Sequence, residues 1–364
     1  MTTAVDLAAL PALDIAARSD RVRSGFDEID TLIVTHLPNV QYLSGFTGSA
    51  GIVVLTANDA WLLTDGRYET QAAEQIADAG VSMQIAIVSS DSAMSDAIAP
   101  LCVGVVGCEA EYLSIGLQAR LSQGATWVAT SMIVEKQRIQ KDAGEVERIA
   151  AACAIADAAF ASVRGHLVEG ISEIDFALEL EFAMRRLGAS AMSFEPIVAA
   201  GSRGALPHAR PTAEHIPRDT LVVCDFGCVV ESYCSDMTRT VAVGDPPPKL
   251  REIYNLVAQA QAAGVVAARA GVALAAVDAA TREPIVAGGY GDYYVHGTGH
   301  GVGLEVHEAP RVAATADGTL ADRTIVTVEP GIYLPGVGGV RIEDTLYVTH
   351  DAPRVLTQSP KDSL

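Results

Sequence analysis

The sequence feature that most constrains the fold is a repeated pattern, in which an apolar strand ends in a carboxylate and then reaches a glycine. The pattern occurs first as TLVVCDFG, residues 220–227, and again as TIVTVEPG, residues 324–331. A second strand-like segment with another acid follows each copy, with Asp236 in SDMTRTVAV and Glu343 in RIEDTLYVT. Two related halves, each with a strand pair that carries two acids, predict a pseudo-symmetric site.

The first copy places Asp225 at the end of a strand that is too apolar for the protein surface. A buried carboxylate is costly unless a cation or hydrogen bonds neutralise it. If the chain folds back near Val230 and Glu231, Asp225 and Asp236 face each other across a hairpin. Facing carboxylates repel each other, whereas divalent cations make ligands of them. The alternative is a solvated hairpin acid beside a strand-end cap, which the apolar strand disfavours.

The second copy repeats the arrangement with Glu329 at the end of its strand. Arg341 and Glu343 are two residues apart on the last strand, so their side chains share one face. We expect Glu343 to enter the site and Arg341 to orient a neighbouring acid or to stabilise its charged form.

Histidines in glycine- and proline-rich loops form the other strong signal. His296 and His300 lie in HGTGHGVG, where the interleaved glycines argue against a helical zinc motif. His307 follows in VHEAP, and His208 lies in LPHARP. A satisfied structural role is the alternative for any single histidine, but four in such loops of one half of the chain indicate a site.

The predicted ligand set combines four carboxylates with one neutral imidazole: Asp225, Asp236, Glu329, Glu343 and His300. Its negative charge balances two divalent ions, with manganese favoured and cobalt or zinc as alternatives. Two such ions activate a hydroxide and polarise a scissile carbonyl. The remaining histidines are then available to stabilise an oxyanion and to move protons.

The chain has 364 residues, which suits two domains. We predict an α/β domain over residues 1–140, with strands at 31–34, 51–55 and 61–63 and a helix over 68–79. The boundary falls between Arg138 and Asp142, where Asp142 and Glu145 have the spacing of a capping box that opens a helix. A second helix begins at 172–175 and ends before Gly188. Residues 141–364 are expected to form a second, α+β domain, which contains both copies of the repeat.

Composition excludes several classes of function. A net charge of -20 argues against nucleic acid and anionic membranes as partners. Residues 1–23 lack the features of a secretory signal, and no apolar run approaches the roughly 18 residues of a membrane helix. The six cysteines are sparse, which fits free thiols in the cytoplasm. Cys224, Cys228 and Cys234 contain no CxxC pair, so we expect packing cysteines rather than a zinc–thiolate site.

The C-terminal part of the chain resembles the pita-bread metallopeptidases, which include Xaa-Pro aminopeptidase, Xaa-Pro dipeptidase (prolidase) and methionine aminopeptidase. The matching segments, in the family's order from Phe194 to Thr345, are FEPIVAAG, LPHARPT, VVCDFG, SDMTRT, HGTGHGVGLEVHEAP, TVEPGIY and GVRIEDT. Upstream, LPNVQYLSGFTGSAG and LLTDGRYETQA resemble the creatinase/prolidase-type N-terminal domain of the Xaa-Pro enzymes. Methionine aminopeptidases lack that domain, which argues against that member.

The resemblance implies a role for each ligand. Asp225 binds one metal ion, His300 and Glu329 bind the other, and Asp236 and Glu343 bridge the two. Glu329 is also the expected proton acceptor near the bridging water.

The resemblance also implies roles for the residues around the ligands. His208 and His307 are the substrate-side histidines, His296 lines the pocket, and Arg341 lies behind the ligands. The expected fold is a curved antiparallel sheet backed by two helix pairs, in a homodimer. The expected substrate is a short peptide with proline in second position. Ser232 and Cys228 depart from the family pattern between the ligands, which puts the turn geometry in doubt.

Two other functions are compatible with the same plan. One is a creatinase-like hydrolase of a small non-peptide substrate, and the other is a catalytically inactive interaction module. The complete ligand set disfavours both. Between dipeptidase and aminopeptidase, Arg311 favours short substrates if it pairs with the carboxylate after proline. A solvated loop arginine is the equal alternative.

Overall fold

The computed structural model describes residues 6–121 and 125–364. Residues 1–5, which begin the segment judged to lack a secretory signal, lie outside the described part. The chain divides into two compact units, and the division falls between Arg138 and Ile139. The segment that ends at Pro11 belongs with the second unit, where Leu7 and Leu10 pack against the core.

The first unit is built on a six-stranded mixed sheet with the strand order β4-β3-β2-β1-β5-β6. Its strands are β1 (Thr31–Val34), β2 (Ile52–Thr56), β3 (Ala60–Asp65), β4 (Gln84–Val88), β5 (Val105–Glu109) and β6 (Thr126–Thr130). Every residue of the TLIV run in β1 is buried, which is typical of a central strand covered on both faces.

Helices flank this sheet. They are α1 (Arg18–Arg23), α2 (Leu37–Ser44), α3 (Glu69–Asp78), α4 (Asp91–Ile98), α5 (Ile115–Leu121) and α6 (Glu135–Arg138). The three predicted strands correspond to β1, β2 and β3, and the predicted helix over 68–79 is α3. A short 3₁₀ turn, Gly66–Tyr68, precedes α3 because the Asp65 carboxylate accepts a hydrogen bond from the backbone of Arg67.

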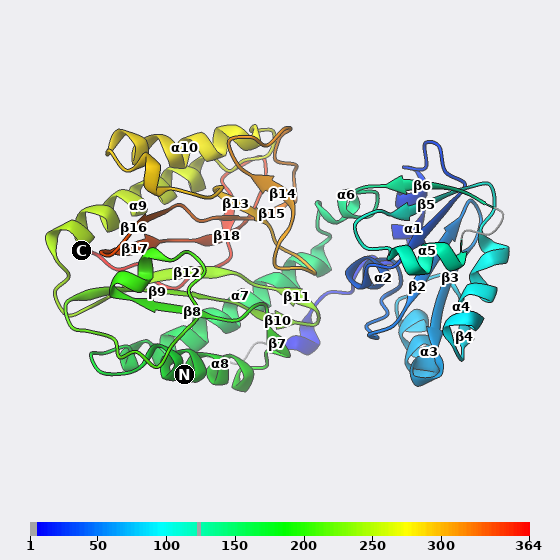
Figure 1. The fold of residues 1–364 in the computed structure, drawn as a ribbon, viewed down its shortest axis with the longest axis horizontal. Coiled ribbons are helices and arrows are strands. Elements are labelled where there is room, and N and C mark those ends of the chain that lie inside the picture. The colour runs from blue at the N-terminus through cyan, green and yellow to red at the C-terminus, as the bar shows by residue number, and fades with distance from the viewer. Residues whose placement is uncertain (1–5, 122–124) are drawn as a thin grey trace. The chain divides into compact units, whose positions relative to one another are not determined.

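The second unit has the two-halves organisation that the repeat predicts, with a helix pair before the strands of each half. The helices are α7 (Ala143–Val163), α8 (Glu173–Arg186), α9 (Pro248–Ala267) and α10 (Leu274–Ala287). Figure 1 shows α7 and α8 along one side of the strands and α9 and α10 along the other. Asp142 and Glu145 form both hydrogen bonds of the predicted capping box, each 2.9 Å long, at the start of α7.

The strands of the second unit pair antiparallel in four small sheets, with the orders β11-β10-β7, β12-β9-β8, β14-β13-β15-β18-β19 and β16-β17. In the first half they are β7 (Ala191–Met192), β8 (Ile197–Ala200), β9 (Thr220–Phe226), β10 (Cys228–Val230), β11 (Tyr233–Cys234) and β12 (Met237–Val243). In the second half they are β13 (Gly299–Gly301), β14 (Glu308–Val312), β15 (Ile325–Val328), β16 (Gly331–Leu334), β17 (Gly338–Arg341), β18 (Asp344–Tyr347) and β19 (Arg354–Val355).

Separate apolar cores lie under the two halves of the second unit. One joins α7 and α8 to β8, β9 and β12, and others join α9 and α10 to β15–β18. The strands that carry the acids are therefore held on both sides by packed helices. No helix in the described part of the chain has the length and apolar character that crossing a membrane requires.

Candidate metal centre

The first pair of acids lies on the hairpin that joins β9 to β12. Its two turn residues, Glu231 and Ser232, have positive φ values of 42° and 74°, as in a type I′ turn. The chain therefore folds back one residue later than predicted, and Thr238 lies opposite Asp225. The prediction that Asp225 and Asp236 face each other directly is wrong. Asp236 is instead the diagonal neighbour of Asp225 on the same face.

The second pair of acids lies just beyond the paired residues of β15 and β18. Val328 is the register partner of Asp344, so the next positions along the two strands, Glu329 and Glu343, fall opposite each other. The two halves thus present four carboxylates to one place, although the geometry differs between them.

His300 reaches the acids from β13. Its Nε2 atom lies 3.5 Å from Oδ2 of Asp236 and 3.4 Å from Oε1 of Glu329. The glycine before it allows this approach, because a Cβ atom on Gly299 would lie 2.0 Å from the carbonyl oxygen of Thr327. The glycine-rich motif therefore brings the imidazole close to the ligand of the neighbouring strand.

The predicted ligands, together with His307, form overlapping groups, in each of which one ligand atom per residue lies within 4.8 Å of the others. The groups are Asp225 with Asp236 and Glu343, His300 with Glu329 and Glu343, and Asp236 with His300 and His307. Glu343 belongs to the first two groups, Asp236 to the first and third, and His300 to the second and third, but only the carboxylates offer two oxygens for two cations. This sharing is what two adjacent cation positions with common ligands require.

The acids have the character of a cation site. Oδ1 of Asp225 and Oε1 of Glu343 are buried and accept no hydrogen bond from the described residues. Burial, together with the neighbouring carboxylates, raises the pKa of Asp236 and that of Glu343 well above their usual range. Burial also raises the pKa of Glu329 to about 8. Such a cluster ionises at neutral pH when cations balance its charge, so the side chains fit divalent metal ions.

Arg341, the last residue of β17, binds the carboxylate of Asp225. Its Nη2 atom donates to Oδ2 of Asp225 over 2.6 Å. The same guanidinium donates to the hydroxyl of Tyr333 at 2.9 Å, to Oγ1 of Thr238 at 3.0 Å and to the carbonyl of Pro207 at 3.1 Å. Four acceptors fix the plane of the guanidinium, and the carboxylate orientation follows from it.

His296 is connected to this arginine through Tyr333. Its Nδ1 atom lies 2.7 Å from the carbonyl of Gly297, and its Nε2 atom lies 2.9 Å from the hydroxyl of Tyr333. Burial lowers the pKa of His296 to about 4, so the ring is neutral at pH 7. Nδ1 must then donate to Gly297, and Nε2 accepts the proton of the Tyr333 hydroxyl.

His307 and His208 lie on the exposed side of the cluster. The ring of His307 packs edge-on against that of His300, with 4.3 Å between the centroids. Burial and the neighbouring His300 lower the pKa of His307, and His208 adds to this effect. His208 follows Pro207, whose carbonyl binds Arg341. The structure thus brings all of the sequence-predicted site residues into one region of the second unit.

Three further residues of the site escaped prediction. Thr238 donates to Oε2 of Glu343 at 2.6 Å, and Thr327 accepts a hydrogen bond from the backbone of His300 at 3.1 Å. Each threonine lies two residues from a predicted ligand, so the two-residue period of a strand is a signal that points to both. Tyr333 has no comparable signal, because its role depends on the pairing of β16 with β17.

The cysteines play the predicted packing role. Cys224, Cys228 and Cys234 are buried, and their thiols are not part of a disulfide. Among the residues that the structure describes, no group suited to a metal ion includes a cysteine.

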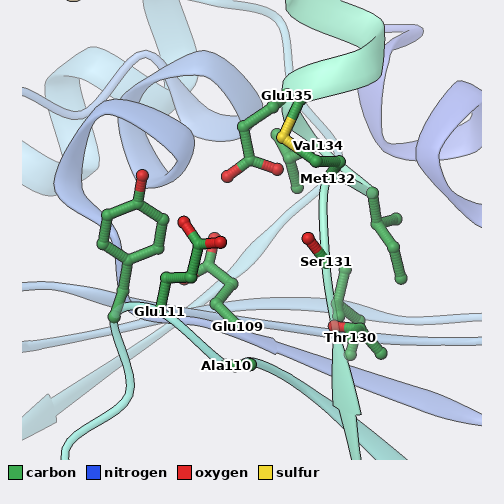
Figure 2. A pocket seen from close by; sticks show the side chains of 11 residues that line it. Glu109, Ala110, Glu111, Thr130, Ser131, Met132, Val134 and Glu135 are labelled. Carbon is green, nitrogen blue, oxygen red and sulfur yellow. The ribbon is translucent and has the colours of Figure 1, made fainter. Parts of the chain in front are cut away.

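A separate small pocket lies in the first unit, where the carboxyl groups of Glu109, Glu111 and Glu135 come together (Figure 2). Its volume of about 20 Å³ suits a single water molecule. Oε2 of Glu109 accepts hydrogen bonds from the backbone of Thr35 at 2.7 Å and of His36 at 2.8 Å. This carboxylate therefore fixes the chain at the start of α2, a structural role.

Comparison with known proteins gives matches to both units of the chain. Residues 147–350 match metallopeptidase family M24, and residues 21–140 match the creatinase/prolidase N-terminal domain. A solved Xaa-Pro dipeptidase from Bacillus anthracis is 41% identical, with a TM-score of 0.91 over 95% of this chain and 98% of its own. An X-Pro aminopeptidase from Thermotoga maritima is 33% identical, with a TM-score of 0.85 over 94% of this chain and 98% of its own.

A curated Xaa-Pro dipeptidase from Pyrococcus horikoshii is 34% identical over 92% of this chain and 95% of its own length. The fold and the cluster of acids and histidine define a metallopeptidase. The chain belongs to metallopeptidase family M24, with the pita-bread catalytic domain preceded by a creatinase/prolidase N-terminal domain. Both the predicted fold class and the predicted family are confirmed.

Proposed function

We propose that this metallopeptidase uses two divalent metal ions to hydrolyse the peptide bond between an N-terminal residue and proline. The observation that carries the proposal is the convergence of four carboxylates and one imidazole, with buried carboxylate oxygens that lack a partner among the described residues. The Xaa-Pro specificity is supported by the names of relatives that match the chain over nearly its full length.

Each ligand has a distinct role in this proposal. Asp225 would hold one ion, His300 and Glu329 would hold the other, and Asp236 and Glu343 would be shared by both. The sharing of Asp236 and Glu343 between the ligand groups supports the bridging roles. Carboxylate oxygens with a single imidazole favour manganese, with cobalt or zinc as alternatives.

The residues around the ligands then carry out proton transfer and substrate binding. Two divalent ions, when bound, would activate a water molecule as the nucleophile and polarise the scissile carbonyl. Glu329 would accept a proton at its carboxylate. His307 and His208 bind the carbonyl oxygen from the exposed side and stabilise the negative charge that develops there.

The other two site residues act on the pocket and on the ligands. His296 lines the pocket as a neutral ring. Arg341 is a positioning residue, because it acts on the substrate through Asp225 and through Tyr333.

Turnover by metal-stripped protein tests this function. We expect cleavage of an Xaa-Pro dipeptide or an Xaa-Pro-Xaa tripeptide after manganese is added, and none without metal. A folded protein that cleaves neither peptide with manganese, cobalt or zinc would refute the proposal.

We assign to Arg311 the preference of the enzyme for short substrates. Arg311 is the register partner of His300 across β13 and β14, and directly opposed residues of an antiparallel pair share a face of the sheet. Its side chain is also exposed, and together with this register the exposure supports a contact with the carboxylate that follows proline. In the Arg311→Ala variant, the ratio of dipeptide to tripeptide turnover is expected to fall. An unchanged ratio would contradict this role.

The homodimer and the cytoplasmic location stay predictions. Sedimentation of the purified protein and fractionation of the cells that make it would test them.

A further inference from the structure

A buried ion pair lies outside the set of proposed ligands. Nζ of Lys141 lies 2.7 Å from Oε1 of Glu308, and the two side chains are only 1% and 5% exposed. Burying two charges costs a desolvation free energy that their attraction does no more than offset in many proteins. A pair of this kind is therefore weak evidence for a role in stability. A role in positioning the neighbouring backbone is the alternative.

Glu308 lies at the end of the turn that leads from His300 to His307. It follows His307, begins β14 and is the register partner of Gly301, which follows His300. The turn packs directly on its carboxylate, because a Cβ atom on Gly303 would lie 2.4 Å from Oε1 of Glu308. The conformation of the turn over residues 301–308 therefore depends on where this carboxylate is held.

Lys141 is fixed at the other end of the ion pair. It lies at the start of the second unit, immediately after the division between Arg138 and Ile139. Its backbone N–H donates to the carbonyl of Arg323 at 2.9 Å, and the preceding residue, Gln140, bridges to Thr324. These contacts tie it to the segment that enters β15.

The same turn is also tied to the first half of the site. The backbone N–H of Cys234 donates to the carbonyl of Gly303 over 2.8 Å, and Cys234 ends β11, two residues before Asp236. The turn thus lies between segments that lead to proposed ligands, and the ammonium of Lys141 sets a positive charge against the carboxylate of Glu308 within it.

We propose that Lys141 is a positioning residue, which holds the 301–308 turn through Glu308 so that His307 stays aligned with His300. This inference rests on the proposed function, in which His307 binds the carbonyl oxygen of the substrate. A displacement of about 1 Å at such a position is enough to lower the rate by up to a hundred-fold.

The test compares two variants. The single variant is Lys141→Met, and the double variant carries both Lys141→Met and Glu308→Met. The single variant removes the ammonium that balances a buried carboxylate and is expected to unfold more easily, whereas the double variant removes both charges and recovers stability. In both variants, manganese-dependent kcat is expected to fall by about ten- to a hundred-fold. Arg164→Met is the matched control, because it breaks the ion pair to Asp362 in the same unit. It should keep the wild-type kcat.

A second readout needs no metal. In metal-free protein labelled with ¹³C at histidine Cε1, we expect the His307 resonance to shift or broaden in the double variant and to keep its position in the control. A stable double variant with wild-type kcat and an unchanged His307 resonance would overturn the proposal. So would an equal loss of kcat in Arg164→Met. If the wild-type enzyme cleaves no Xaa-Pro peptide, the proposed function fails, and the resonance still decides the role of Lys141.

Discussion

Nη2 of Arg341 donates to Oδ2 of Asp225 over 2.6 Å, and both side chains are nearly inaccessible to solvent. Oδ1 of the same carboxylate has no hydrogen-bond partner among the described residues. One oxygen of Asp225 is therefore bound by the guanidinium of Arg341, and the other is available to a metal ion. Arg341 can therefore lie among the acids and still leave carboxylate oxygens available to metal ions.

Arg341→Lys is expected to fold but to lose activity. A lysine ammonium carries the same charge, but it lacks the planar fork that serves Asp225, Tyr333 and Thr238 together. We expect kcat/KM to fall by about a hundred-fold, which corresponds to about 2.7 kcal/mol. Steady-state kinetics with circular dichroism as the folding check would measure this. Arg148→Lys, at a partly exposed pair with Glu231, is the control. Wild-type kcat/KM in Arg341→Lys would contradict the argument.

Tyr333→Phe removes the hydroxyl that joins Arg341 to His296. That hydroxyl accepts from Arg341 and donates to Nε2 of the neutral imidazole. The substitution removes both hydrogen bonds, each worth about 1 kcal/mol, so we expect kcat to fall about thirty-fold. The pKa of His296 should rise slightly, because the donor stabilises the neutral ring, and stay low, because burial is its main cause. Histidine NMR titration would show both directions, and a lower pKa would refute the assigned donor.

The stability of the metal-free protein is expected to fall as the pH rises. Burial raises the pKa of Glu329 from 4.5 to about 8, so the folded state binds a proton that the unfolded state has released. The stabilisation is fully present below about pH 4.5 and is lost as the pH rises through about 8. The slope is about 1.4 kcal/mol per pH unit for each such proton.

Urea unfolding of metal-stripped protein between these pH values would measure that slope. Bound manganese should abolish it, because the ligands are then held ionised at every pH in the window. Glu329→Gln should flatten the metal-free profile without any metal. A metal-free wild-type profile that rises with pH would show that the carboxylates are ionised in the folded state.

The sequence was sufficient to predict which acids the structure brings together, because an acid at the end of an apolar strand has few other uses. Asp225 and Glu329 stand out against the buried residues that precede them, and the glycines around His300 mark a close approach. The start of α7 was equally predictable, since Asp142 and Glu145 cap it through local contacts alone.

Contacts between distant segments were not predictable in the same way. The diagonal placement of Asp236 depends on a turn at Ser232. This residue takes a positive φ although it is not glycine, and the adjacent sequence does not predict that conformation. Tyr333 reaches His296, and Lys141 reaches Glu308, only after separate strands have packed. Pattern and propensity describe a segment and its own periodicity, and these pairs are set by tertiary structure.

Glu343→Gln is expected to change stability and function in opposite directions. Glu343 belongs to two of the ligand groups, and burial raises its pKa well above the usual range, so its charge destabilises the metal-free fold. The amide keeps the acceptor for Thr238 and removes that charge. We expect metal-free Glu343→Gln to be more stable than the wild type by on the order of 1–3 kcal/mol at pH 8.

The same substitution should remove the stabilisation by manganese and nearly all of the activity, because a neutral amide is a poor ligand for two cations at once. Thermal unfolding with and without manganese, together with metal analysis of the dialysed protein, would separate the effects. Glu214→Gln, at an exposed acid, is the matched control and should change neither. If Glu343→Gln retains two metal ions and cleaves peptide at the wild-type rate, Glu343 is no bridging ligand, and its burial among the other acids needs another cause.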